Sequence, residues 1–317
     1  MNPTLALSTA WCSQRHGDGF AMLREMADLG FTHAELSHGI RITLVDGILR
    51  AVEQGVIQVG SVHNFCPLPA GVTQAAPNLY EPSAIDGTER EQWVRQTKRS
   101  IDFAAKVRAR VLVCHLGSAF FLWFNPVRKL QAYLSVHPGA GRADDAKYQA
   151  LLAKAVAKLR RRMGRFWDNT RDSISKVLDY AAENHVILGF ENREKFEELP
   201  VDADFPAFLA GLPAGAAAGY WHDTGHAEIK QDLGLLSQRQ QLTENAGRLL
   251  GFHLHDVDAE GHDHQPVGSG RVDFAQISEF WRGYHMLVLE LSPRATVEEV
   301  VASKARLEEL QRLRGLL

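Results

Sequence analysis

The chain has 317 residues, of which 45% are hydrophobic and 23% are charged, and its formal net charge is −3 at pH 7. This composition excludes a disordered chain and is typical of a soluble globular protein. The N-terminal segment has neither a basic region nor a long apolar run, so we expect no signal peptide, no membrane span and a cytoplasmic location. Three scattered cysteines, Cys12, Cys66 and Cys114, exclude a disulfide framework and indicate buried thiols.

Short apolar runs alternate with amphipathic helical patterns along the whole chain. This alternation is typical of βαβ units and a parallel sheet. The eight expected strands are residues 4–8, 33–37, 56–63, 110–115, 186–191, 217–223, 249–256 and 285–291. About eight strands, each followed by a helix, predict a (β/α)8 TIM barrel, whose usual size is ~250 residues. We therefore expect a single TIM-barrel domain over residues 1–317.

Two helix starts can be read from capping residues. Asp18 and Gly19 open an amphipathic run that ends at Gly30, and Thr88 with Glu91 three residues later has the spacing of a capping box.

A helical and aromatic insertion is expected at residues 119–165, between the fourth and fifth strands. It begins with FFLWFNP and leads into a helical pattern long enough to project beyond the barrel. Residues 126–171 carry 11 Lys and Arg against three Asp, a net +8, which leaves −11 for the rest of the chain. Two interpretations stay open: a lid or subunit contact with a solvated basic face, or a platform for an anionic ligand. The aromatic run either packs in a core or covers the pocket.

Polar side chains follow six consecutive strands at their carboxyl ends. In TIM barrels these ends form the rim where active sites lie, so polar residues there indicate catalysis or metal binding. One such residue would carry little weight, but six in the same register indicate a metal site. The residues are His63, His115, Glu191, Asp223 with His226, His253 with His255 and Asp256, and Glu290.

Glu191 and Glu290 lie in otherwise apolar strands, where a carboxylate is costly to bury unless it is paired or bound to a metal. With Asp223 and a neutral imidazole they form an oxygen-rich site suited to Mn²⁺, Mg²⁺, Co²⁺ or Zn²⁺. Such an ion can polarise a carbonyl while a carboxylate removes the proton next to it.

The remaining histidines are assigned more modest roles. Strand alternation predicts that His222, of opposite parity to Asp223, packs behind the sheet. His255 either orients a ligand from behind or faces solvent. The histidines expected to be structural or on the surface are His16, His33, His38, His137, His185 and His285.

Seven segments resemble the xylose isomerase-like barrel superfamily, which includes sugar phosphate isomerases and epimerases, ketose 3-epimerases and type IV apurinic endonucleases. In chain order they are SVHNF, VLVCHLGS, LGFENRE, HDTGHAE, GFHLHD, HDHQPVGSGRVDF and LVLEL. They fall between residues 61 and 291 and are more specific for the superfamily than for one reaction.

Resemblance to the epimerases implies one divalent metal ion held by Glu191, Asp223, His253 and Glu290. The two glutamates then act as an acid/base pair that moves a proton through an enediolate, while His226 and the loop of His264 contact sugar hydroxyls. We therefore expect a metal-dependent isomerase or epimerase of a sugar or sugar-like substrate.

Resemblance to the endonucleases implies instead a phosphodiesterase with three zinc ions. His63 and His115 would join Glu191 at the first ion, and the third would take His226, His262 and His264. His262 stands where that family has an aspartate. More than one metal ion per chain is therefore an open alternative.

The expected partner is a small sugar-like molecule. Loops such as residues 66–86 carry no Lys or Arg, which argues against a DNA enzyme. No membrane partner is expected, and a homo-oligomer stays open. Further alternatives are a multinuclear iron enzyme, a lyase, and a barrel that binds sugar without catalysis.

Overall fold

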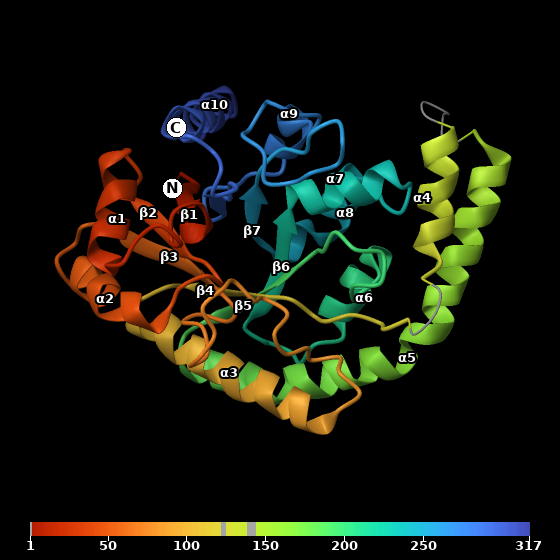
Figure 1. Cartoon of the computed structure of the whole chain (residues 1–317), viewed down its shortest axis with the longest axis horizontal. Helices are drawn as coiled ribbons and strands as arrows, with labels where there is room; N and C mark the ends of the chain where they lie inside the picture. The colour runs from red at the N-terminus through yellow and green to blue at the C-terminus, as the bar shows by residue number, and fades with distance from the viewer. Residues whose placement is uncertain (1, 122–124, 138–143) are drawn as a thin grey trace.

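The computed structural model describes residues 2–121, 125–137 and 144–317, and its eight parallel strands close into one barrel in sequence order, with β8 beside β1 (Figure 1). The strands are β1 (Thr4–Ser8), β2 (His33–Leu36), β3 (Gln58–His63), β4 (Val111–Cys114), β5 (Ile187–Glu191), β6 (Ala218–Asp223), β7 (Leu249–Leu254) and β8 (Met286–Leu289). This confirms the predicted (β/α)8 barrel, and each strand lies within two residues of its expected bounds.

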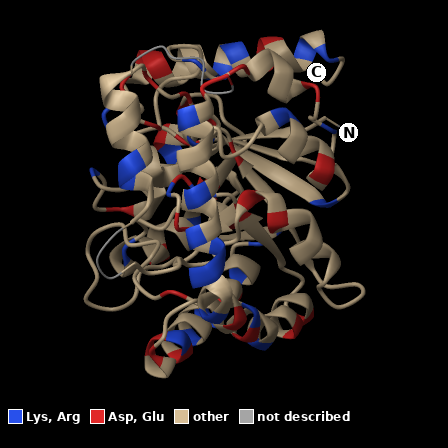
Figure 2. Ribbon diagram, turned by 90° about the vertical axis from the view of Figure 1, so that its right-hand side faces the viewer, with Lys and Arg blue, Asp and Glu red and all other residues tan. Residues whose placement is uncertain are grey.

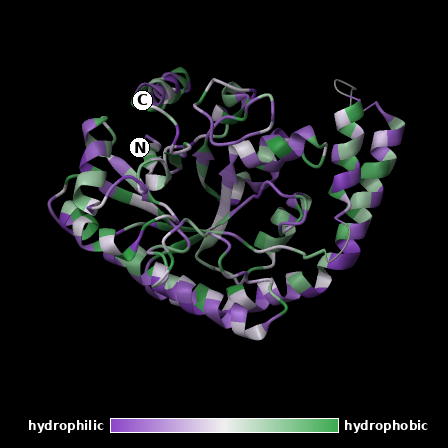
Figure 3. Ribbon diagram, in the orientation of Figure 1, coloured by the Kyte–Doolittle hydropathy of each residue, from purple (hydrophilic) through white to green (hydrophobic). Residues whose placement is uncertain are grey.

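Helices follow the strands and cover the outside of the barrel. The α-helices are α1 (Gly19–Asp28), α2 (Val45–Glu53), α3 (Gly87–Lys106), α4 (Val127–Val136), α5 (Ala146–Glu183), α6 (Phe205–Ala210), α7 (Thr224–Asp232), α8 (Gln238–Asn245), α9 (Phe274–Ser278) and α10 (Val297–Leu313). Short 3₁₀ helices are η1 (Thr9–Trp11), η2 (Ile42–Leu44), η3 (Asp202–Asp204) and η4 (Ala246–Arg248). Hydrophobic and hydrophilic residues alternate along α3 and α5, as expected of helices with one face on the barrel (Figure 3).

Capping residues explain where two of these helices begin. The Asp18 side chain accepts a hydrogen bond from the backbone of Ala21 and starts α1, as predicted. The predicted capping box at Thr88 is wrong, because Asp86 is the N-cap of α3 and accepts from the Thr88 backbone. An aspartate two residues earlier serves the same free N–H groups, so the helix starts one residue before Thr88.

The barrel interior has an apolar layer beneath a polar one. Val113, Trp221 and Val288 belong to a small buried cluster separate from the main core between strands and helices. A Cβ at Gly251 would lie 2.7 Å from the Trp221 indole, so glycine at this position makes room for the ring. Because side chains alternate along a strand, residue 223 lies on the same face as Trp221 but one layer higher.

The insertion is a helical hairpin of α4 and the first part of α5, which projects from one side of the barrel (Figure 1). Apolar residues of both helices form their own buried cluster, which includes Leu130, Tyr148 and Leu159. Lys and Arg residues recur along these helices (Figure 2). Of the aromatic run, Trp123 and Phe124 lie outside the described residues, and Phe120 is 56% exposed. None of the described hairpin residues lines the cavity of the site below.

The second part of α5 packs on the barrel and holds neighbouring loops by hydrogen bonds. Asn169 donates to the carbonyl groups of Ser83 and Ala84, and Thr170 donates to that of Leu116. One unbroken helix therefore joins the hairpin to backbone beside strand β4. Within the described ranges, no helix is both long and apolar enough to cross a membrane.

Candidate metal centre and active site

Four predicted residues converge at the carboxyl ends of strands β5 to β8. The ligand atoms of Glu191, Asp223, His253 and Glu290 all lie within 4.8 Å of one another, and all four side chains are buried. Nδ1 of His253 is 2.6 Å from Oε1 of Glu191, 3.2 Å from Oε2 of Glu290 and 3.8 Å from Oδ2 of Asp223. Three carboxylates around one imidazole nitrogen form a donor set that suits a divalent cation.

Glu35, on strand β2, contacts the other ring nitrogen of His253. The sequence did not predict it as a site residue. Both of its oxygens lie 3.1 Å from Nε2 of His253, and it accepts hydrogen bonds from Ser8 and Ser61. A carboxylate only accepts, so Nε2 carries a proton and Nδ1 is the atom that faces the other acids. Burial opposes a charge on His253, but Glu290, Glu35 and Glu191 raise the pKa of its imidazole. A cation at Nδ1 would replace a second proton there.

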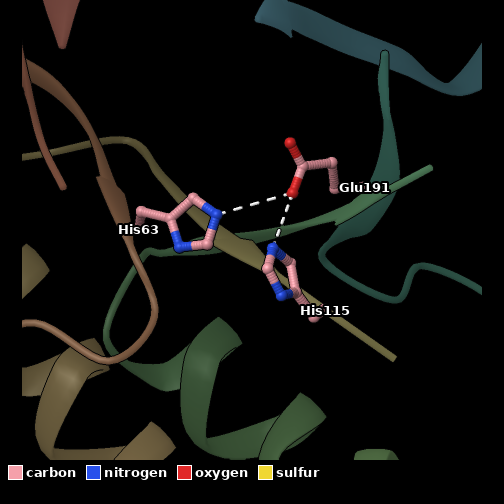
Figure 4. Close-up of side chains that lie close together, drawn as sticks. All are labelled: His63, His115 and Glu191. Atoms are coloured by element: carbon pink, nitrogen blue, oxygen red, sulfur yellow. Dashed lines mark ion pairs between the residues drawn. The ribbon is translucent and has the colours of Figure 1, made fainter. Parts of the chain in front are cut away.

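A second group of donors lies beside the first, at the ends of β3 and β4. Nε2 of His63 and of His115 lie 3.5 and 2.9 Å from the same oxygen, Oε2 of Glu191 (Figure 4). Nδ1 of His63 faces the backbone oxygen of Asn64, and Nδ1 of His115 faces the side-chain oxygen of Asn78. Each Nδ1 is therefore the donor, and each Nε2 presents its lone pair to a carboxylate oxygen.

The state of the His115 ring shows whether these residues fit a metal ion. Nε2 of His115 is buried and has no hydrogen-bond partner among the described residues, although it lies close to Glu191. Burial lowers the pKa of His115 to about 3, with Arg193 contributing, so the ring is neutral. Neutral imidazoles whose other nitrogen is held by an oxygen are the usual ligands of zinc and similar ions. His63, His115 and Glu191 therefore fit a metal ion.

The loop after β7 brings a third group to the site, with one difference from the prediction. His226 lies 3.2 Å from Asp223 and 3.6 Å from Asp263, and its ligand atom groups with those of Asp263 and Glu194. The side chain of His262 is 74% exposed and bonds Asp258 instead. The prediction that His262 joins this group is therefore wrong in the structure. Asp263, one residue later, points inward in its place.

His264 also reaches the site, 2.9 Å from Asp263 and 3.8 Å from Glu290. Burial opposes its charge, but the hydrogen bond to Asp263 and the charge of Glu290 raise the pKa of His264 to about 9. Asp256 holds the loop that follows, since its carboxylate accepts from the backbone of Val257 and Val272 and of two glycines, Gly268 and Gly270. The carboxylate of Asp256 thus fixes the glycine-rich turn through four backbone N–H groups that converge on it.

Of the two interpretations of His255, the structure favours orientation. Its side chain is fully buried; Nδ1 accepts from the backbone N–H of His264, and Nε2 lies 3.0 Å from Asp223. Nε2 therefore carries the proton and orients the Asp223 carboxylate. His222 packs behind the sheet as predicted, bonded to Tyr220 and Gln238.

Arg193 was also missed from the sequence. It lies two residues beyond β5, 11% exposed, with Nη1 3.3 Å from Glu191 and Nε 3.3 Å from Glu198. Burial opposes its charge, but these acids raise the pKa of Arg193 further, so the guanidinium stays charged. It thereby offsets part of the negative charge of the cluster.

A cavity of about 440 Å³ opens over these groups. Its lining combines the metal donors with polar residues that follow strands β1, β2 and β8. His38, which was expected to be structural or on the surface, lines this cavity, with its ring 4.8 Å from that of His63. The side chains that line the cavity include Ser13, Gln14, Ser37, His38, His63, His115, Glu191, Arg193, Glu194, His226, Asp263, His264, Glu290 and Ser292.

The chain matches the family model of the xylose isomerase-like TIM barrel over residues 23–308 and belongs to this family, which confirms the resemblance inferred from the sequence. A comparison with curated proteins found no match.

Solved structures share the fold over nearly the whole chain. A D-tagatose 3-epimerase-like protein has 16% identity and a TM-score of 0.67, with 99% of this chain and 98% of that one covered. 3-Keto-D-glucoside 4-epimerase from E. coli has 13% identity and a TM-score of 0.65, with 97% of this chain and 99% of that one covered. D-psicose 3-epimerase from Clostridium cellulolyticum has 13% identity and a TM-score of 0.64, with 98% of this chain and 99% of that one covered. At these identities the likeness establishes the fold.

Proposed function

We propose that the protein is a divalent-metal-dependent isomerase or epimerase that acts on a sugar or sugar-like ketone by proton transfer through an enediolate. The observation that carries the proposal is the pair of carboxylates, Glu191 and Glu290, which lie 2.6 and 3.2 Å from Nδ1 of His253. They come from β5 and from the residue after β8, two strands that are not neighbours in the barrel. The sugar epimerases among the structures of the same fold support this substrate class.

In this proposal Glu191, Asp223, His253 and Glu290 hold one divalent cation, which is Mn²⁺, Mg²⁺, Co²⁺ or Zn²⁺. When bound, the cation polarises the substrate carbonyl and so acidifies the neighbouring C–H bond. One of the two glutamates removes that proton and leaves an enediolate. In an epimerase the other would return a proton to the same carbon from the opposite face, which inverts that carbon. In an isomerase the proton would go to the former carbonyl carbon, while the hydroxyl proton passes from one oxygen to the other, which moves the carbonyl to the neighbouring carbon. His255 and Glu35 hold the donors in place throughout.

The experiment that tests this proposal combines metal analysis with proton exchange. Elemental mass spectrometry of protein purified without added metal should find about one Mn, Co, Mg or Zn per chain. The loaded protein should then exchange a carbon-bound proton of D-tagatose, D-allulose or D-fructose for deuterium in D₂O, as followed by NMR. Loss of exchange on chelation and its return with metal would support the proposal. A loaded protein that exchanges none of these ketoses contradicts it.

A second candidate function is phosphodiester hydrolysis with two or three zinc ions. The observation in its favour is the overlap of three donor groups, which share Glu191 or lie beside it: the His63 and His115 group, the Asp223 and His253 group, and the His226 and Asp263 group. Two or three zinc ions per chain, together with hydrolysis of bis(p-nitrophenyl) phosphate, would favour this function over the first.

A further inference from the structure

His38 differs from the other histidines of the cavity in its hydrogen bonding. It follows β2, and its imidazole forms part of the cavity wall. Nδ1 is buried and has no hydrogen-bond partner among the described residues, and no bond to Nε2 exists there either. A buried polar atom without a partner is rare in native proteins and calls for an explanation.

In the neighbouring histidines both ring nitrogens face an oxygen atom. His63 and His115 each use Nδ1 for a fixed oxygen and Nε2 for the metal donor group, and both nitrogens of His253 face carboxylates. The ring of His38 stands edge-on to that of His63, at 4.8 Å between centroids. Among the described residues, however, no group of metal donor atoms includes His38. Nδ1 is fully buried, so Nε2, which is neither fully buried nor hydrogen-bonded to a described residue, is the atom that suits a molecule in the cavity better than a metal ion.

The loops after β1 and β2 contribute uncharged polar groups to the cavity wall near His38. Ser13, Gln14 and Ser37 line the cavity beside it. A Cβ at Gly39 would lie 3.1 Å from Oγ of Ser13 and 3.6 Å from Oγ of Ser37, so the glycine keeps space open between these hydroxyls. A neutral imidazole offers one donor and one acceptor. Such a wall matches the hydroxyl groups of a neutral polyol.

We propose that His38 is a substrate-binding residue whose ring nitrogen hydrogen-bonds a hydroxyl group of the sugar-like substrate, on the side of the cavity formed by the loops after β1 and β2. This inference rests on the proposed function and adds to it a residue that recognises hydroxyls without holding the metal.

The test uses the full-length, metal-loaded protein and the variants His38→Ala, His38→Gln and His33→Ala. His33 is the matched control, because it lies at the other end of β2, bonds Thr32 and does not line the cavity. For each variant, kcat and KM are measured for deuterium exchange into D-tagatose, D-allulose and D-fructose, together with metal per chain and Tm. We expect His38→Ala to raise KM roughly 3- to 10-fold with unchanged metal content. His38→Gln should recover part of this loss, and His33→Ala should match the wild type.

Two results would overturn the inference alone: exchange by the wild type with an unchanged KM in His38→Ala, or loss of metal from that variant, which would make His38 a support for His63. A loaded wild-type protein that exchanges no ketose would overturn the proposed function and this inference with it. The wild-type measurement therefore separates the two failures.

Discussion

His253 is held between two carboxylates, with Nε2 3.1 Å from both oxygens of Glu35 and Nδ1 2.6 Å from Glu191. Glu35 is completely buried, and among the described residues its hydrogen-bond partners are Ser8, Ser61 and this ring. Its position fixes which nitrogen of His253 faces the metal donors.

We therefore expect Glu35→Ala to lower metal affinity by about 10- to 100-fold, because the imidazole loses the partner that orients it. Competition with a chelator of known affinity measures the effect. Ser61→Ala, which removes only one hydrogen bond to Glu35, is the control and should cost less. Equal affinity in Glu35→Ala and the wild type would show that packing alone orients the ring.

The two-glutamate mechanism predicts that Glu191→Gln and Glu290→Gln each lower kcat for deuterium exchange by about 10²-fold or more at saturating metal, because an amide cannot take up the proton. Glu197→Gln is the matched control, since Glu197 bonds Asn125 rather than the metal donors. Circular dichroism should show the same fold in all three variants. Exchange retained in both cluster variants would contradict the mechanism.

Because of His285, we expect the free energy of unfolding to fall at acid pH. This histidine is 2% exposed, lies just before β8, and its Nδ1 accepts from the backbone N–H of Arg282. Burial, with the charge of Arg282, lowers the pKa of His285 to about 4. Between pH 6.5 and 4 the unfolded chain therefore binds a proton that the folded chain does not, so stability falls as pH falls.

From this residue alone we expect the free energy of unfolding to drop by about 2 kcal/mol between pH 7 and pH 5. His285→Asn keeps an acceptor for the Arg282 N–H but does not titrate, so its drop should be smaller by that amount. Urea unfolding of the metal-free protein at both pH values measures the difference. Identical drops in the two proteins would show that folding does not lower the pKa of His285.

The hairpin should be separable from the metal centre. Leu130 is the buried residue of α4, and Leu130→Ala should weaken the packing of α4 on α5 by about 2–5 kcal/mol. We expect faster hydrogen exchange of the α4 amides with no change in metal affinity. Val136→Ala, at a position that is 68% exposed, is the control. A loss of metal from the Leu130 variant would instead make the hairpin part of the site.

The sequence predicted the barrel because the strands repeat one pattern eight times, and a repeated period tolerates errors at single boundaries. It also indicated the donors on strands β3 to β8, because each stands at the end of an apolar run. Glu35 could have been found by the argument applied to Glu191 and Glu290, since it too is a carboxylate within an apolar strand.

Asp263 and His38 could not be found in this way, because both lie in loops, where no periodicity fixes the direction of a side chain. A positive φ of 90° at Gly261 and of 55° at His264 turns the chain so that residue 263, not 262, faces inward. Arg193 follows its strand by two residues and depends on Glu198 for its position. Such contacts arise from tertiary packing and have no local signature.

Helix α5 is 38 residues long, which at 1.5 Å per residue makes about 57 Å of continuous helix, and it bends between the hairpin and the barrel (Figure 1). One end carries the hairpin, and Thr170, farther along, is tied to the carbonyl of Leu116, the residue next to His115. The hairpin and the backbone beside this candidate metal donor are therefore attached to the same helix. α5 thus contributes both to the core of the hairpin and to the frame that holds His115 in place.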